Sequence, residues 1–145
     1  MATGATASSS TQQASLVSAG IAARQSAIDT IQAFASSNGA APAVQDYLLA
    51  GVVAENNAQS ISGVSSANLA AVNASVKAGS LSATPSTAEL QTLASAGVIA
   101  FNTALLALNY YVTDSTNNAP PSLQQLAIAG ADHLSNSQLA SLTST

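Results

Sequence analysis

Apolar residues recur three and four positions apart along much of this chain, which is the spacing that places side chains on one face of a helix. Leu69, Val72 and Val76 follow this spacing after Ser65. The alternation of β-branched and polar residues that indicates strands is scarce. The pattern therefore predicts an all-α protein.

The helical pattern occurs twice, in the same order. "SAGIAA" at 18–23 and "SAGVIA" at 95–100 are the clearest pair, and apolar positions around them align with apolar positions. Self-similarity at a fixed offset is the mark of a duplicated unit. We infer a duplication in which three blocks correspond: 9–34 with 86–111, 38–52 with 117–131, and 65–76 with 135–145.

Signals for the ends of helices also come in pairs. Ser9 and Ser86 each stand three residues before a Gln or Glu, which is the capping-box pattern of a helix start. Gly20 and Gly97 are expected to end or kink a first short helix, because glycine costs about 1 kcal/mol inside a helix and is favoured just after its end. A second helix is expected over 21–36 and over 98–113. A third is expected to have Pro42 or Pro121 in its first turn and to end near Gly51 or Gly130. A fourth is expected over 65–77 and over 135–143.

The expected architecture is two pseudo-repeats of about four short helices each, fused into one compact helical bundle. A Ser- and Thr-rich N-terminal arm, expected to be flexible, comes first, and "VAENNAQSISG" at 53–63 reads as an extra loop in the first copy. The boundaries are 1–11 for the arm, 12–77 for the first repeat, 78–85 for the linker and 86–145 for the second repeat.

Charge is scarce in this chain. Charged residues make up 6% of it, the formal net charge is −4, and Arg24 and Lys77 are the two basic residues. Nucleic-acid binding needs several Lys or Arg on one face, so we exclude it. A surface with so little charge does not repel other copies of itself. We therefore expect copies of this chain to be its partners.

Residue types that carry chemistry are few and scattered. The chain has no Cys, and His133 is its one histidine, with Asp132 beside it. Adjacent residues on a helix do not face one another, so this pair does not form a metal site. Catalytic serine needs a base and a group that orients the base, and no such set is visible. We expect no enzyme activity, no cofactor and no metal.

The most apolar stretch runs over 96–112. It is shorter than the roughly 20 residues that a membrane span needs and is interrupted by polar residues, so we expect a buried core helix rather than membrane insertion. A helix that is apolar nearly all round must be covered on all sides, and another subunit is expected to supply part of that cover. The residues expected to carry self-association are Phe34, Tyr47, Phe101, Leu105, Tyr110 and Tyr111.

Three segments resemble the Ala-rich helical repeats of very large bacterial surface adhesins: "VQDYLLAGV" at 44–52, "GVSSANLAAVNASV" at 63–76 and "PSTAELQTLASAGV" at 85–98. The resemblance implies helical modules on the cell exterior that serve as spacers or adhesive units, with no catalytic residues. It also implies export without a cleaved N-terminal signal, and "MATGATASSSTQQ" lacks the features of a signal peptide.

The expected function is structural: a self-associating subunit of an extracellular filament, sheath or surface layer, of the adhesion or biofilm type. Repeat modules bury a shared face against their neighbours, and head-to-tail contacts that do not close give fibres. Two alternatives stay open, a ligand- or surface-binding module of a giant adhesin and a small virion structural protein.

Overall fold

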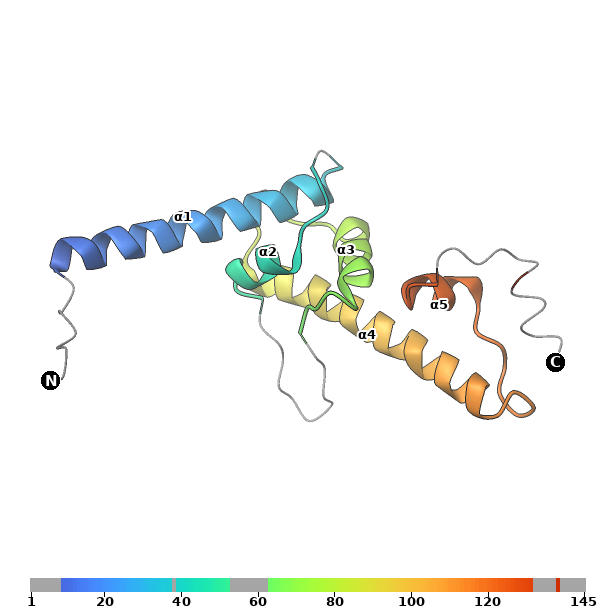
Figure 1. The fold of residues 1–145 in the computed structure, drawn as a ribbon. Coiled ribbons are helices and arrows are strands. Elements are labelled where there is room, and N and C mark those ends of the chain that lie inside the picture. The colour runs from blue at the N-terminus through green and yellow to red at the C-terminus, as the bar shows by residue number, and fades with distance from the viewer. Residues whose placement is uncertain (1–8, 38, 53–62, 132–137, 139–145) are drawn as a thin grey trace, which may run out of the picture.

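The computed structural model describes residues 9–37, 39–52, 63–131 and 138. Within these residues the chain is all-α, with five helices and no strand (Figure 1). This confirms the predicted class. The helices are α1 (Ser10–Ala35), α2 (Val44–Leu49), α3 (Leu69–Ala78), α4 (Thr87–Thr113) and α5 (Leu123–Ile128).

The two long helices begin with the predicted capping boxes. At α1, the Ser9 hydroxyl accepts from the Gln12 N–H at 3.3 Å, and the Gln12 side chain accepts from the Ser9 N–H at 2.8 Å. At α4, Ser86 and Glu89 make the same two bonds, at 3.2 and 2.9 Å. These bonds pair backbone N–H groups that the first turn of a helix would otherwise leave without a partner. Each of the two helices therefore begins directly after its capping serine.

The prediction that a first short helix ends at Gly20 and at Gly97 was wrong. Both glycines lie inside continuous helices, α1 of 26 residues and α4 of 27. The described part of each repeat therefore has one long helix where two short ones were expected. At Gly97 the reason is tertiary: α3 packs so closely against this point that a side chain would not fit.

The short helices α2 and α5 occupy corresponding places in the two repeats and end in the same way. Gly51 and Gly130 follow them with positive φ, +88° and +91°, a conformation that glycine adopts without strain. Their N–H groups donate to the carbonyls of Leu48 and Ala127 at 3.1 and 3.0 Å. The predicted ends near these glycines are confirmed. The predicted starts were early, because Pro42 and Pro121 precede the N-caps instead of lying in the first turn.

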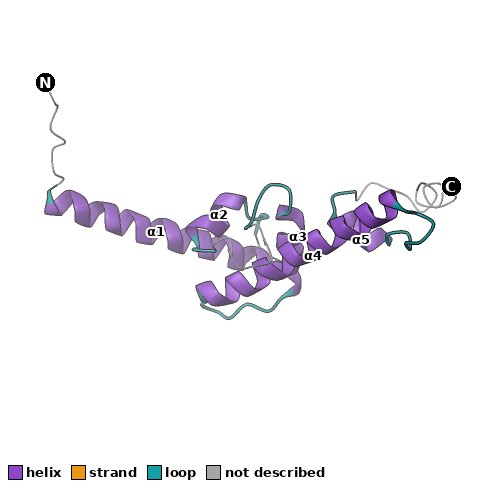
Figure 2. Cartoon of the chain, turned by 90° about the horizontal axis from the view of Figure 1, so that it is seen from below, coloured by secondary structure: helices purple, strands orange, loops and turns teal. Residues whose placement is uncertain are grey.

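Packing connects the repeats through the middle of the molecule. The second half of α1 lies against α2, α3 lies across the first half of α4, and α5 lies beside the second half of α4 (Figures 1 and 2). The first half of α1 projects away from the other helices in both views. Residues from both repeats form one core: Ala27, Ile28, Ile31, Tyr47, Ala50, Val52, Val72, Val76, Leu90, Ala94 and Val98.

One buried polar chain pins α2 to α3. The Tyr47 hydroxyl donates to Asn73 Oδ1 at 2.6 Å, and Asn73 Nδ2 donates to the Pro42 carbonyl at 3.1 Å. All three residues are buried. Buried polar groups are costly when unpaired. These two hydrogen bonds therefore pair the buried polar atoms of Tyr47 and Asn73 and at the same time fix the position of α2 against α3.

Parts of the predicted domain plan fall outside the described residues. The expected arm is described only from Ser9, and Ser10 and Thr11 already belong to α1. The expected loop over 53–63 is described only at its last residue, and the expected helix over 135–143 only at Gln138. The connection between repeats runs over 79–86, close to the predicted linker.

Candidate interaction surface

Apolar side chains lie on one face of both halves of α1, with Arg24 between the two groups, and the other helices cover only the group on the second half. Ala27, Ile28 and Ile31 on the second half are buried in the core. One to three turns earlier on the same face, Leu16, Val17 and Ile21 are 69%, 62% and 66% exposed. We call residues 16, 17, 20 and 21 the open face of α1. Three large apolar side chains this exposed on one helix face indicate a contact surface.

The second repeat shows the same face in a covered state. Counterparts of the open face in α4 are Leu93, Ala94, Gly97 and Val98. Here α3 lies over them, so that Ala94 and Val98 are 1% and 2% exposed and Leu93 packs against the core. Aligned apolar positions of the two repeats are therefore exposed in α1 and covered by a helix in α4.

Gly97 is the point of closest approach between α3 and α4. A Cβ added there would lie 2.5 Å from the Val72 Cα and 2.8 Å from the Ala71 carbonyl oxygen, too close for any side chain. One turn away, the Ser75 hydroxyl donates to the Leu93 carbonyl at 2.8 Å. At Gly20, by contrast, an added Cβ would meet no atom of the described part of the chain within 4 Å. The first repeat thus has the glycine that close packing requires, but none of the described helices packs against it.

A second open region lies on the last half of α4. Leu105 is 42% exposed, whereas its counterpart Ile28 in α1 is 8% exposed. Ile28 lies at the segment 83–85 that leads into the second repeat. Val112, two helical turns after Leu105 on the same face, is also exposed. In the middle of the molecule, each repeat covers apolar positions of the other. On the first half of α1 and the last half of α4, the corresponding positions are exposed.

The predicted contact residues divide into three groups. Tyr47 is fully buried in the chain's own core, so its side chain is unavailable to another molecule. Phe34 is half-buried at the core, with the Lys77 ammonium 4.6 Å from its ring centroid. On α4, Leu105 and Tyr110 are exposed, and Phe101 and Tyr111 are half-buried. The structure does not gather these six residues into one patch.

Leu16, Val17 and Ile21 are absent from the residues predicted from the sequence. The signal that could have found them is the repeat itself, because it aligns them with the apolar residues of 93–98. What the sequence lacks is any sign of which copy is covered.

Both basic residues are engaged in hydrogen bonds, Arg24 between the two repeats and Lys77 within the first. Arg24 donates to the Thr87 hydroxyl at the start of α4, and Lys77 Nζ donates to the Phe34 carbonyl at 3.0 Å. Hydrogen bonds from Ser86 and Ser82 lower the pKa of the Glu89 carboxyl. These charged groups serve helix ends and connections, which leaves the open face of α1 apolar.

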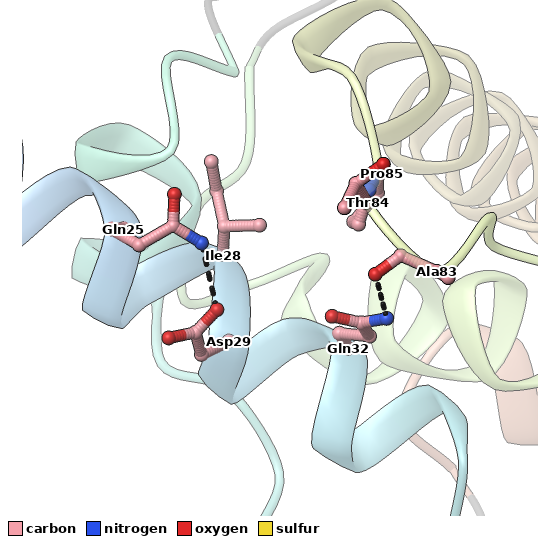
Figure 3. A pocket seen from close by; sticks show the side chains of 7 residues that line it. All are labelled: Gln25, Ile28, Asp29, Gln32, Ala83, Thr84 and Pro85. Carbon is pink, nitrogen blue, oxygen red and sulfur yellow. Dashed lines mark hydrogen bonds between the residues drawn. The ribbon is translucent and has the colours of Figure 1, made fainter.

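A cavity of about 200 Å³ lies between α1 and residues 83–85 (Figure 3). Three of the polar side chains that line it, Gln25, Asp29 and Gln32, are hydrogen-bonded within the protein. Gln25 Nε2 donates to Asp29 Oδ1 at 2.8 Å, and Gln32 Nε2 donates to the Ala83 carbonyl at 2.7 Å. With its amides committed in this way, the cavity acts as part of the contact between repeats.

Two further observations concern chemistry and membranes. Among the described residues, no three His, Cys, Asp or Glu side chains lie together as a metal would require, and His133 lies outside these residues. In the same part of the chain, α4 is the one helix long and apolar enough to cross a membrane. Length and composition alone do not distinguish a span from the core helix of a soluble protein, and the first half of α4 packs in the core.

Comparisons with protein-family models, with curated proteins and with solved structures find no match for this chain. The resemblance to adhesin repeats therefore stays a prediction.

Proposed function

We propose that this protein is a structural, self-associating subunit of an extracellular filament, sheath or surface layer, with no enzymatic role. The observation that carries the proposal is the open face of α1, an apolar surface whose counterpart in the second repeat is covered by a helix. The low charge of the chain supports it, because little electrostatic repulsion opposes contact between copies. The extracellular location rests on the resemblance to adhesin repeats.

The size of the open face sets the expected strength of association. Fully burying a Leu, Val or Ile side chain stabilises by about 1.5–3 kcal/mol. Covering the exposed two-thirds of Leu16, Val17 and Ile21 therefore gives about 3–6 kcal/mol, and the partner's surface adds a similar amount. Association costs about 4–15 kcal/mol in lost freedom of motion. We expect assembly that depends strongly on concentration.

Sedimentation velocity and negative-stain electron microscopy of the purified protein at rising concentration test the proposal. Species larger than the 14.2 kDa chain, growing with concentration and elongated in images, are expected. High salt is expected to strengthen the assembly, because the contact is apolar rather than ionic. A monomer at every accessible concentration would contradict the proposal.

The adhesin module is the second candidate, because a preceding repeat in a longer chain would cover the open face of α1 equally well. The same experiment separates the two candidates. A module of that kind stays monomeric when isolated, and it binds a surface or ligand instead.

A further inference from the structure

The contact between the two repeats inside the chain is a template for a contact between two chains. We propose that the C-terminal segment 135–145 of one copy docks on the open face of α1 of the next copy, as α3 docks on α4. This deepens the proposed function and rests on it. It assigns the docking face, the segment that occupies it and the polarity of the assembly.

The occupant is identified by its sequence. Residues 135–145 align without a gap with 65–75, the segment that runs into α3. Leu139 and Ala140 match Leu69 and Ala70, and Leu142 stands where α3 has the fully buried Val72. Thr145 stands at the position of Ser75, whose hydroxyl bonds the Leu93 carbonyl. The segment thus matches α3 in residue type at these four positions, whereas the buried Ala71 and Asn73 correspond to Ser141 and Thr143.

The acceptor is identified by its glycine. Val72 reaches α4 because Gly97 leaves room for the backbone of α3. Gly20 leaves the same room on α1, with none of the described residues within 4 Å of an added Cβ. Because glycine costs a helix about 1 kcal/mol, this position is unfavourable in the single chain and becomes useful when a helix packs there. Leu16 and Ile21 flank it as Leu93 and Val98 flank Gly97.

The arrangement of the helices favours a second copy over the chain's own terminus. α5 is the last described helix before 135–145, and it lies at the opposite end of the molecule from the open half of α1 in both views (Figures 1 and 2). α3 itself cannot be the occupant, because it already covers α4 of its own chain. A contact between two different surfaces leaves one free surface of each kind on every pair of copies. Copies joined in this way therefore form a head-to-tail chain.

Two single variants test the contact from its two sides. Gly20→Leu places a side chain where the incoming backbone must lie, and Leu142→Asp places a charge at the apolar centre of the incoming segment. Each variant alone is expected to associate at least about tenfold more weakly than the wild type in sedimentation velocity. Ala19→Leu is the matched control for the first, because its counterpart Ala96 is exposed in α4; it should assemble like the wild type.

Mixing the two variants is the decisive measurement. Gly20→Leu keeps a working C-terminal segment, and Leu142→Asp keeps a working open face. Their mixture should therefore form one-to-one dimers that grow no further. Circular dichroism of each variant confirms that the helices are retained.

The possible failures differ from one another. If the wild type assembles and either variant assembles equally well, this contact is wrong and the proposed function stands. If both variants are monomers and their mixture also stays monomeric, the pairing of segment with face is wrong. If the wild type never assembles, the proposed function and this contact both fall.

Discussion

A pair of Gly→Ala substitutions, at Gly20 and Gly97, measures how much the close packing of α3 contributes to the fold. Both glycines lie inside long helices at equivalent positions of the repeat. Alanine should gain about 1 kcal/mol at either site from helix propensity and from a less flexible unfolded chain. At Gly20, where nothing lies within 4 Å of the new methyl group, the whole gain should appear as added stability.

At Gly97 the same methyl group meets the backbone of α3, 2.5 Å from the Val72 Cα. A backbone atom cannot rotate away as a side chain does, so α3 must move outward by about 1 Å to restore van der Waals contact. That movement loosens Val72 and Val76 against Leu90. Overpacking of this kind costs about 1–3 kcal/mol. The free energies of unfolding of the two alanine variants should therefore differ by about 1–3 kcal/mol, with Gly97→Ala the less stable.

Urea unfolding followed by circular dichroism measures this difference, at a protein concentration low enough to keep the chains monomeric. The propensity gain cancels between the variants, so the difference reports the contact alone. Equal m-values would show that both variants unfold from equally compact states. Equal stabilisation by the two alanines would refute the close packing at Gly97, and with it the template for docking at Gly20.

Further predictions concern the buried polar chain and the helix caps. Tyr47→Phe leaves Asn73 Oδ1 without its donor and should lower the free energy of unfolding by about 1–3 kcal/mol; an unchanged urea midpoint would contradict this. Burial, and secondarily the charge of Asp46, raise the pKa of Tyr47 above the ordinary 10.0, so the folded chain holds this proton where the unfolded chain has lost it. Wild-type stability should therefore fall as pH rises above about 10, with a steeper slope than in Tyr47→Phe when both are unfolded in urea between about pH 8 and pH 11. Ser86→Ala removes the cap of α4 and should cost about 1 kcal/mol of global stability, whereas Ser9→Ala at the cap of α1 should mainly fray a turn that packs on nothing. Hydrogen exchange distinguishes these two results, and equal loss of global stability in both variants would show that the first half of α1 is not independent of the core.

The sequence by itself determined the fold class and most helix ends. A capping box involves four consecutive residues, and a glycine of positive φ ends the turn directly before it. The helix starts at Ser9 and Ser86 and the helix ends at Gly51 and Gly130 could therefore be predicted from neighbouring residues alone. The apolar spacing of three and four residues likewise predicts helices before any packing is known.

Only the tertiary structure decided what Gly20 and Gly97 do. A glycine inside an apolar helical pattern favours a helix end, and it equally permits a close helix crossing. The choice at Gly97 depends on α3, which lies about twenty residues earlier in the chain. Exposure was decided in the same way: Tyr47 is buried where Asn73 accepts a hydrogen bond from its hydroxyl, and Leu16 is exposed because none of the other described helices packs against it. The aligned positions are apolar in both segments, and the packing of α3 on α4 is what makes one face buried while the other is exposed.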